Sequence, residues 1–264
     1  MSQAGIDGMR AAGDELLEVA RSFDDTEWRT PSAAAGWTVL DVVSHVGCLL
    51  ELLQGAVNGA EAPDLGIEAL NEAMVAERRD WEPARTLDNV QKQLDQAIEV
   101  FTPLQDEPTA SVEIPMLDLG VHPLHAIADM FVFDMTTHVR YDILAPRGPI
   151  GRQLPPLDAA RLKPSVTWLL GGIPTMQPDL PNHLAAPLAL RLTGPAGSDT
   201  LIRNTSGAIT LEPLQTTDTP AATLTSTTTD FLALATTRLS WRALVTIDGD
   251  HRIAAEFLDA LNLI

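Results

Sequence analysis

Cysteine is almost absent from this sequence of 264 residues. The single cysteine, Cys48, excludes a disulfide within the chain, which is typical of proteins that work in a reducing compartment. Cys48 stands in the apolar stretch VGCLL, where a small buried thiol is the expected role and a nucleophilic thiol is the alternative. We therefore expect a cytoplasmic protein without disulfide cross-links.

Basic residues and long apolar runs are also scarce. The chain has 17 lysine and arginine residues against 36 aspartate and glutamate residues, and its formal net charge is −19. Residues 1–150 hold 26 of the acidic side chains and only 9 of the basic ones. Such a surface repels phosphate backbones and anionic lipids, which argues against nucleic acids and membrane surfaces as partners. No apolar run approaches about 18 residues, and residues 1–10 lack the apolar segment of a signal peptide, so no membrane span is predicted.

Apolar residues make up 45% of the chain, which is enough to form a buried core. In the first half they recur at helical spacing. Thr38 and Asp41 form a capping box that starts one helix, and Gly59 is a suitable end for it. The expected helices cover residues 5–22, 38–58, 66–80, 86–101 and 123–144, with Pro123 in the first turn of the last, followed by one at 155–171. Amphipathic helices joined by modest loops predict a helical bundle over residues 1–175.

The pattern changes near residue 187. Threonine becomes frequent and apolar residues alternate with polar ones, which is typical of strands. The expected strands cover 188–193, 200–203 and 208–211, with a turn at 194–197, and the expected helices cover 229–236 and 251–261. We therefore predict a two-domain α+β protein whose second domain, residues 185–264, carries helices on a small antiparallel sheet. Three prolines, Pro174, Pro178 and Pro181, mark the boundary.

Two polar residues interrupt the apolar face of the expected helix 123–144. This face passes through Ile127, Met130 and Phe131, and it continues at Asp134 and His138. Asp134 and His138 are four residues apart, so both side chains point to the same place. Burying an unpaired carboxylate costs several kcal/mol, so Asp134 needs a partner.

The capped helix 38–58 places a histidine on its buried face in the same way. Val42 and Leu49 define that face, and His45 falls within it. Two histidines and a carboxylate leave open positions on a zinc ion, as catalytic zinc sites require, and the same set suits nickel or iron(II). This pattern leaves two alternatives open, namely a hydrogen-bonded core histidine and a buried ion pair between Asp134 and His138.

An anionic substrate would need an arginine near the metal. Arg140 points away from His138 by helical geometry, so it is not a candidate. Three other arginines near expected helix ends are candidates, although a solvated surface charge is the alternative for each: Arg78, Arg79 and Arg85. Trp28 and Trp37 stand at the expected entrance of the bundle, where a packing role is the alternative.

Three segments resemble the mycothiol-dependent maleylpyruvate isomerase family, which belongs to the DinB-like superfamily. Residues 28–45, WRTPSAAAGWTVLDVVSH, resemble the start of the family's first domain. Residues 134–142, DMTTHVRYD, resemble its second metal segment. Residues 241–261 resemble the end of its C-terminal domain. The order and spacing of the three segments strengthen the resemblance, which spans most of the chain.

The resemblance implies a DinB-like four-helix bundle with a three-ligand metal site, followed by a sterol-carrier-protein-like α+β domain. The family's ligand positions fall on His45, Asp134 and His138, although glutamate is usual at the position of Asp134. In the family a metal-bound thiolate of mycothiol, or of another low-molecular-weight thiol, attacks a small electrophile. The resemblance therefore implies a transferase or isomerase, and it implies an actinobacterial source. A binding or stress-response protein of the same fold, or a metal-dependent hydrolase, is the alternative.

Overall fold

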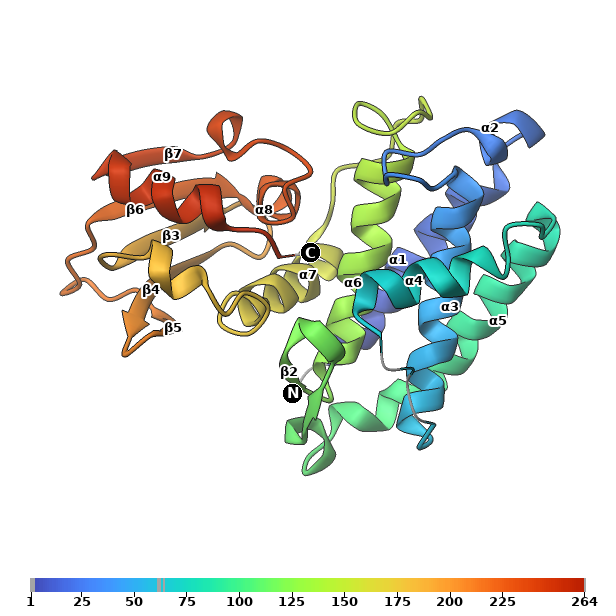
Figure 1. The fold of residues 1–264 in the computed structure, drawn as a ribbon, viewed down its shortest axis with the longest axis horizontal. Coiled ribbons are helices and arrows are strands. Elements are labelled where there is room, and N and C mark those ends of the chain that lie inside the picture. The colour runs from blue at the N-terminus through green and yellow to red at the C-terminus, as the bar shows by residue number, and fades with distance from the viewer. Residues whose placement is uncertain (1–2, 61–62, 64, 264) are drawn as a thin grey trace. The chain divides into compact units, whose positions relative to one another are not determined.

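The computed structural model describes residues 3–60, 63 and 65–263, and it divides the chain into two compact units, Met1–Pro156 and Leu157–Ile264 (Figure 1). The first unit is helical and the second combines helices with a sheet. The sequence prediction of a helical first part and an α+β second part is therefore confirmed at this level.

The helices of the first unit are α1 (Ala4–Arg21), α2 (Asp25–Arg29), α3 (Val39–Val57), α4 (Ile67–Ala76), α5 (Pro83–Phe101) and α6 (Ala126–Thr137). In the core of this unit, α1 packs against both α5 and α6, and α3 packs against α5 (Figure 1). The buried faces are apolar, as the helical spacing predicts, with Ile6, Leu94 and Phe131 among the side chains closed off from solvent.

The start and the end of α3 match the sequence signals. The Thr38 hydroxyl accepts a hydrogen bond from the Asp41 amide at 3.2 Å, and the Asp41 carboxylate accepts one from the Thr38 amide at 2.8 Å. Beyond the last turn, Gly59 has φ +88°, a backbone conformation that favours glycine. By length and composition α3 could cross a membrane, but 72% of its most apolar window is buried inside the protein, as expected for a core helix.

The connector between α5 and α6 differs from the prediction. Two short 3₁₀ turns, Thr102–Gln105 and Thr109–Ser111, are followed by an antiparallel pair of strands, β1 (Glu113–Pro115) and β2 (Val121–Pro123), around a third turn, Leu117–Leu119. Pro123 therefore ends a strand and does not lie in the first turn of a helix. The amides of Leu124 and His125 still bond to the connector, at Val112 O and Ala110 O, so α6 begins only at Ala126.

The end of the same predicted helix is also different in form. From His138 to Ile143 the chain continues α6 as a π-helix, and the amide of Leu144 bonds to Val139 O at 3.0 Å. Such wider turns are rare and are frequent at functional sites.

The boundary between the two units lies between Pro156 and Leu157, earlier than the predicted end of the first domain at residue 175. The helix predicted at 155–171 is α7 (Ala159–Gly172), and it packs against α8 (Thr228–Ala235). α7 therefore belongs to the second unit, and the three prolines after it lie inside that unit.

The second unit contains a five-stranded sheet in the order β5-β4-β3-β6-β7. Its strands are β3 (Leu188–Thr193), β4 (Ser198–Thr205), β5 (Ala208–Pro213), β6 (Ala222–Thr227) and β7 (Thr246–Gly249), and α9 (His251–Ala260) follows. The sequence predicted the first three strands and not the last two. It also predicted an antiparallel sheet, whereas β3 pairs with β6 in parallel, so the sheet is mixed.

Candidate metal centre

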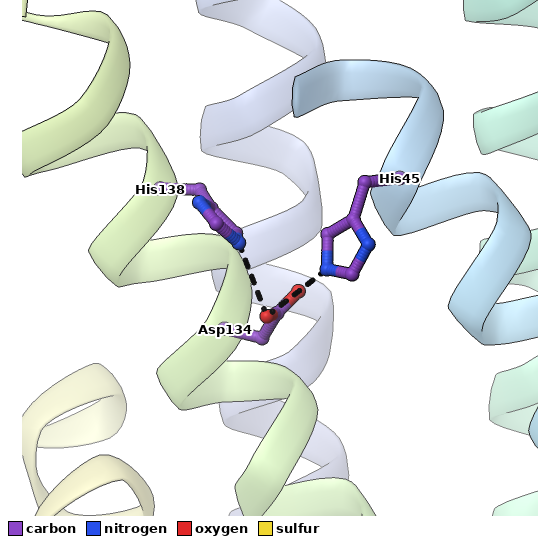
Figure 2. A group of neighbouring side chains, drawn as sticks. All are labelled: His45, Asp134 and His138. Carbon is purple, nitrogen blue, oxygen red and sulfur yellow. Dashed lines mark ion pairs between the residues drawn. The ribbon is translucent and has the colours of Figure 1, made fainter. Parts of the chain in front are cut away.

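Two helices of the first unit bring His45, Asp134 and His138 together. His45 lies in the middle of α3. Asp134 lies near the end of α6, and His138 lies one turn further on, at the start of the π-helix (Figure 2). The side chains of both histidines are almost fully buried, and 15% of the Asp134 side chain is exposed. The structure therefore places all three residues where the interrupted apolar faces predicted them, on the inner sides of two facing helices.

The distances within this cluster are compatible with one ion bound by all three residues. Asp134 Oδ1 lies 3.5 Å from His45 Nε2 and 3.3 Å from His138 Nε2, and one ligand atom of each residue lies within 4.8 Å of the others. Ligands bound tetrahedrally to zinc at about 2.0–2.1 Å are about 3.3 Å apart, so the two distances from Asp134 already match this spacing.

A buried oxygen in the cluster also lacks a partner. Asp134 Oδ2 is shielded from solvent and accepts no hydrogen bond from the described part of the chain. Buried carboxylate oxygens normally have a partner, and an unpartnered one needs an explanation such as an ion. The donor set, with two imidazoles and one carboxylate, fits a divalent cation of the zinc type.

Behind His138 lies a second carboxylate that sequence reasoning did not assign to the site. His138 Nδ1 donates a hydrogen bond to Asp142 Oδ2 at 2.8 Å, and the Asp142 side chain is only 1% exposed. Arg147 forms an ion pair with the other oxygen of Asp142. The spacing of four residues from His138 was the available signal, because it places Asp142 one turn further along the same helix.

The indole ring of Trp37 lies against His45. The centroids of the two rings are 5.1 Å apart, and the Trp37 ring nitrogen donates a hydrogen bond to Glu72 of α4 at 2.9 Å. Glu72 also pairs with Arg79. Trp37 therefore forms one wall of the cluster, while Trp28 packs against Phe23.

Of the three candidate arginines, Arg79 is the one that the structure connects to the edge of the cluster. It pairs with Glu72, which anchors Trp37, and its Nε lies 3.7 Å from Asp41. Arg78 instead pairs with Glu51, and Arg85 lies over the ring of Trp81.

Cys48 is a buried thiol that does not belong to the cluster. The thiol is buried, its Sγ lies 3.6 Å from Met74 O, and burial raises its pKa, so it is a poor nucleophile.

Two other histidines bond to the connector: His122 Nε2 lies 2.8 Å from Leu119 O, and His125 Nδ1 lies 2.9 Å from Ala110 O. These contacts give His122 and His125 structural roles, as burial does for Cys48.

Comparison with known proteins identifies the family. The sequence profile described as the mycothiol maleylpyruvate isomerase N-terminal domain matches residues 9–140, half of the chain, and this range includes His45, Asp134 and His138. The chain belongs to the mycothiol maleylpyruvate isomerase family. The resemblance found in the sequence is thereby confirmed. No curated protein matches the sequence.

Two solved structures share the fold of this family member. Both are crystal structures of the mycothiol-dependent maleylpyruvate isomerase, one of a histidine-to-alanine mutant, and each is 15% identical. Each match covers 94% of this chain and 96% of the other, with a TM-score of 0.58. A solution structure of the sterol carrier protein domain 2 of Helicoverpa armigera, 15% identical, covers 41% of this chain and 91% of its own with a TM-score of 0.26, which is too low to assign a fold.

The charges in the cluster hold a proton on His138 when no metal is bound. Burial alone would lower the pKa of His138, but the carboxylates of Asp134 and Asp142 outweigh it and raise this pKa to about 9. Burial would raise the pKa of Asp134, but the two histidines outweigh it and hold this pKa well below its usual range. Near neutral pH, a metal must therefore displace the proton of His138, while Asp134 is already ionised.

This competition predicts that zinc affinity depends on pH. Because a metal binds the neutral imidazole, the apparent affinity should rise by about tenfold per pH unit up to the pKa of His138, which is about 9, and then level off. Competition with a chelator of known pH dependence measures the affinity, and calorimetry in buffers of different ionisation enthalpy counts the released proton. An affinity that stays constant between about pH 7 and pH 9 would contradict the expected displacement of this proton.

Proposed function

We propose that this chain is a metal-dependent enzyme that uses a mycothiol-type thiol, as a transferase or isomerase, on a small electrophilic substrate. The main support for this proposal is that His45, Asp134 and His138 converge inside the region that the family profile matches. The metal we propose is zinc, with nickel or iron(II) as alternatives that the same ligands suit. Three protein ligands leave a position for a thiol.

The residues of the cluster have separate tasks in this proposal. A zinc ion bound here would supply positive charge that lowers the pKa of a coordinated thiol and so favours the thiolate at neutral pH. Asp134 contributes the only negative charge among the three ligands, so the occupied site keeps a net positive charge. Trp37 covers His45 and limits the access of water on that side. Arg79, beside the Trp37 anchor, is the arginine we propose for an anionic substrate.

We also propose the finer features of the fold that the family resemblance implies. The helices α1, α3, α5 and α6 would form a DinB-like four-helix bundle, which their pairwise packing supports. The second unit would be a sterol-carrier-protein-like domain, which its mixed sheet with flanking helices supports. A cytoplasmic location follows from the use of a low-molecular-weight thiol and from the single buried cysteine.

The proposed reaction can be tested by thiol consumption. Zinc-loaded protein and chelator-treated protein are incubated with mycothiol and either maleylpyruvate or monochlorobimane, and isomerisation or fluorescent conjugation is followed. We expect turnover that requires both the thiol and the metal, and that returns when zinc is added back to the treated protein. A parallel reaction with the thiol omitted serves as the control.

Two outcomes would contradict this function. Turnover that needs the metal and no thiol would point to a metal-dependent hydrolase, in which the ion activates water. No turnover with either electrophile, together with tight retention of a small molecule, would point to a binding or stress-response protein of the same fold.

A further inference from the structure

The two histidines of the cluster differ in the hydrogen bonding of their Nδ1 atoms. His138 Nδ1 is 2.8 Å from Asp142 Oδ2, whereas His45 Nδ1 is buried and has no hydrogen-bond partner in residues 3–60, 63 and 65–263. In the neutral imidazole that binds a metal, a carboxylate at Nδ1 fixes the remaining proton there, so that Nε2 presents its lone pair. In His138 it is Nε2 that faces Asp134, at 3.3 Å.

Asp142 is itself held in place. Its second oxygen pairs with Arg147, and the same guanidinium donates a hydrogen bond to Tyr141 O at 3.2 Å. One oxygen of this carboxylate pairs with His138 and the other pairs with Arg147. It is therefore not available as a fourth metal ligand.

The segment that carries Arg147 turns tightly against the end of the π-helix. Gly148 donates its amide to Leu144 O at 2.8 Å, and a Cβ at Gly148 would lie 2.3 Å from the Ile143 carbonyl carbon. Only glycine allows so close an approach of two backbones. The π-helix that starts at His138 places Asp142 on the inner side of the same turn. This tight turn places Arg147 close enough to pair with Asp142.

We propose that Asp142, braced by Arg147, is the positioning residue that fixes the ring of His138 with Nε2 toward the metal. This inference rests on the proposed metal site and does not depend on which reaction the site performs. Residues that hold a metal-bound histidine from behind typically change metal affinity by about 10- to 100-fold when they are replaced.

The test measures zinc affinity and the His138 ring proton. Asp142→Ala should weaken zinc binding by about 10- to 100-fold in a chelator competition. Asp142→Asn keeps one oxygen that can accept from Nδ1 but turns an amide NH2 toward Arg147, so its zinc affinity should lie between those of Asp142→Ala and the wild type. In ¹⁵N-labelled, zinc-loaded wild-type protein, the Nδ1 proton of His138 should exchange slowly with solvent. This signal should persist in Asp142→Asn and disappear in Asp142→Ala. Asp88→Ala, which removes an exposed carboxylate on α5, is the matched control and should change neither readout.

Several results would overturn the proposal. One is an Asp142→Ala protein with wild-type zinc affinity; another is an Nδ1 signal that survives this substitution. If Asp142→Ala does not fold by circular dichroism, Arg147→Ala decides: a lower zinc affinity supports the proposal, and an unchanged affinity contradicts it. Wild-type protein that binds no zinc would overturn this proposal and the proposed function together. Normal zinc binding without thiol chemistry would overturn only the proposed function.

Discussion

Replacing His138 with alanine is expected to weaken zinc binding by about a hundred- to a thousandfold. Four-ligand structural zinc sites bind with about 10–16 kcal/mol, which is roughly 2.5–4 kcal/mol for each ligand. A change of about 1.4 kcal/mol corresponds to tenfold in affinity. The loss should exceed that of Asp142→Ala, because His138 supplies a bond to the ion and Asp142 acts through His138.

Elemental analysis of protein purified without chelator, followed by chelator competition, measures this loss. His45→Ala should behave similarly, because His45 provides the second buried imidazole. His251→Ala is the control, since it removes an exposed histidine at the start of α9 in the other unit. If wild type, His45→Ala and His138→Ala retain equal amounts of zinc, the cluster is a buried ion pair and not a metal site.

The family resemblance implies a glutamate at the position of Asp134, and the shorter aspartate side chain still reaches both histidines. Its Oδ1 lies 3.3 Å from His138 Nε2 and 3.5 Å from His45 Nε2. One carboxylate oxygen therefore already stands between the two imidazoles. The missing methylene group does not break the convergence of the three donors.

The sequence predicted the longer helices of the first unit, though not the short α2, and it predicted the convergence of the three residues, because both depend on local periodicity. A polar side chain on an apolar helical face has to meet something polar in the core, and His45 and Asp134 meet there. The capping box at Thr38 correctly predicted the start of α3 for the same reason, since all its bonds form within four residues.

The features that the sequence missed depend on contacts between distant residues. β6 has the alternating burial of a strand, but its inward positions include Ala222 and Ser226, which carry a weak apolar signal. Its parallel pairing with β3 joins residues more than thirty positions apart. Likewise, α7 resembled the preceding helices, and only its packing on α8 assigns it to the second unit.

The role of Asp142 was missed for a different reason. Its spacing from His138 is visible in the sequence, but a carboxylate four residues after a histidine is equally compatible with solvent exposure. The deciding facts are its burial and its pairing with Arg147, which the turn at Gly148 makes possible. Neither the π-helix nor this close backbone approach has a sequence signature of its own.

Replacing Phe131 with alanine is expected to lower the free energy of unfolding of the metal-free first unit by about 3–5 kcal/mol. Phe131 is fully buried on α6, three residues before Asp134, and its ring stacks on Phe101 of α5 with centroids 5.8 Å apart. The change removes both the ring stacking and a large apolar area from the core. Urea denaturation followed by tryptophan fluorescence measures the difference.

Val112→Ala is the matched control, because Val112 is 48% exposed in the connector. Substitutions at such exposed positions usually change stability by less than about 0.5 kcal/mol. Because the chain has two units, the unfolding of each has to be resolved, and only the transition of the first unit should shift. If Phe131→Ala were no less stable than Val112→Ala, the stacking of Phe131 on Phe101 and its burial in the core would be wrong.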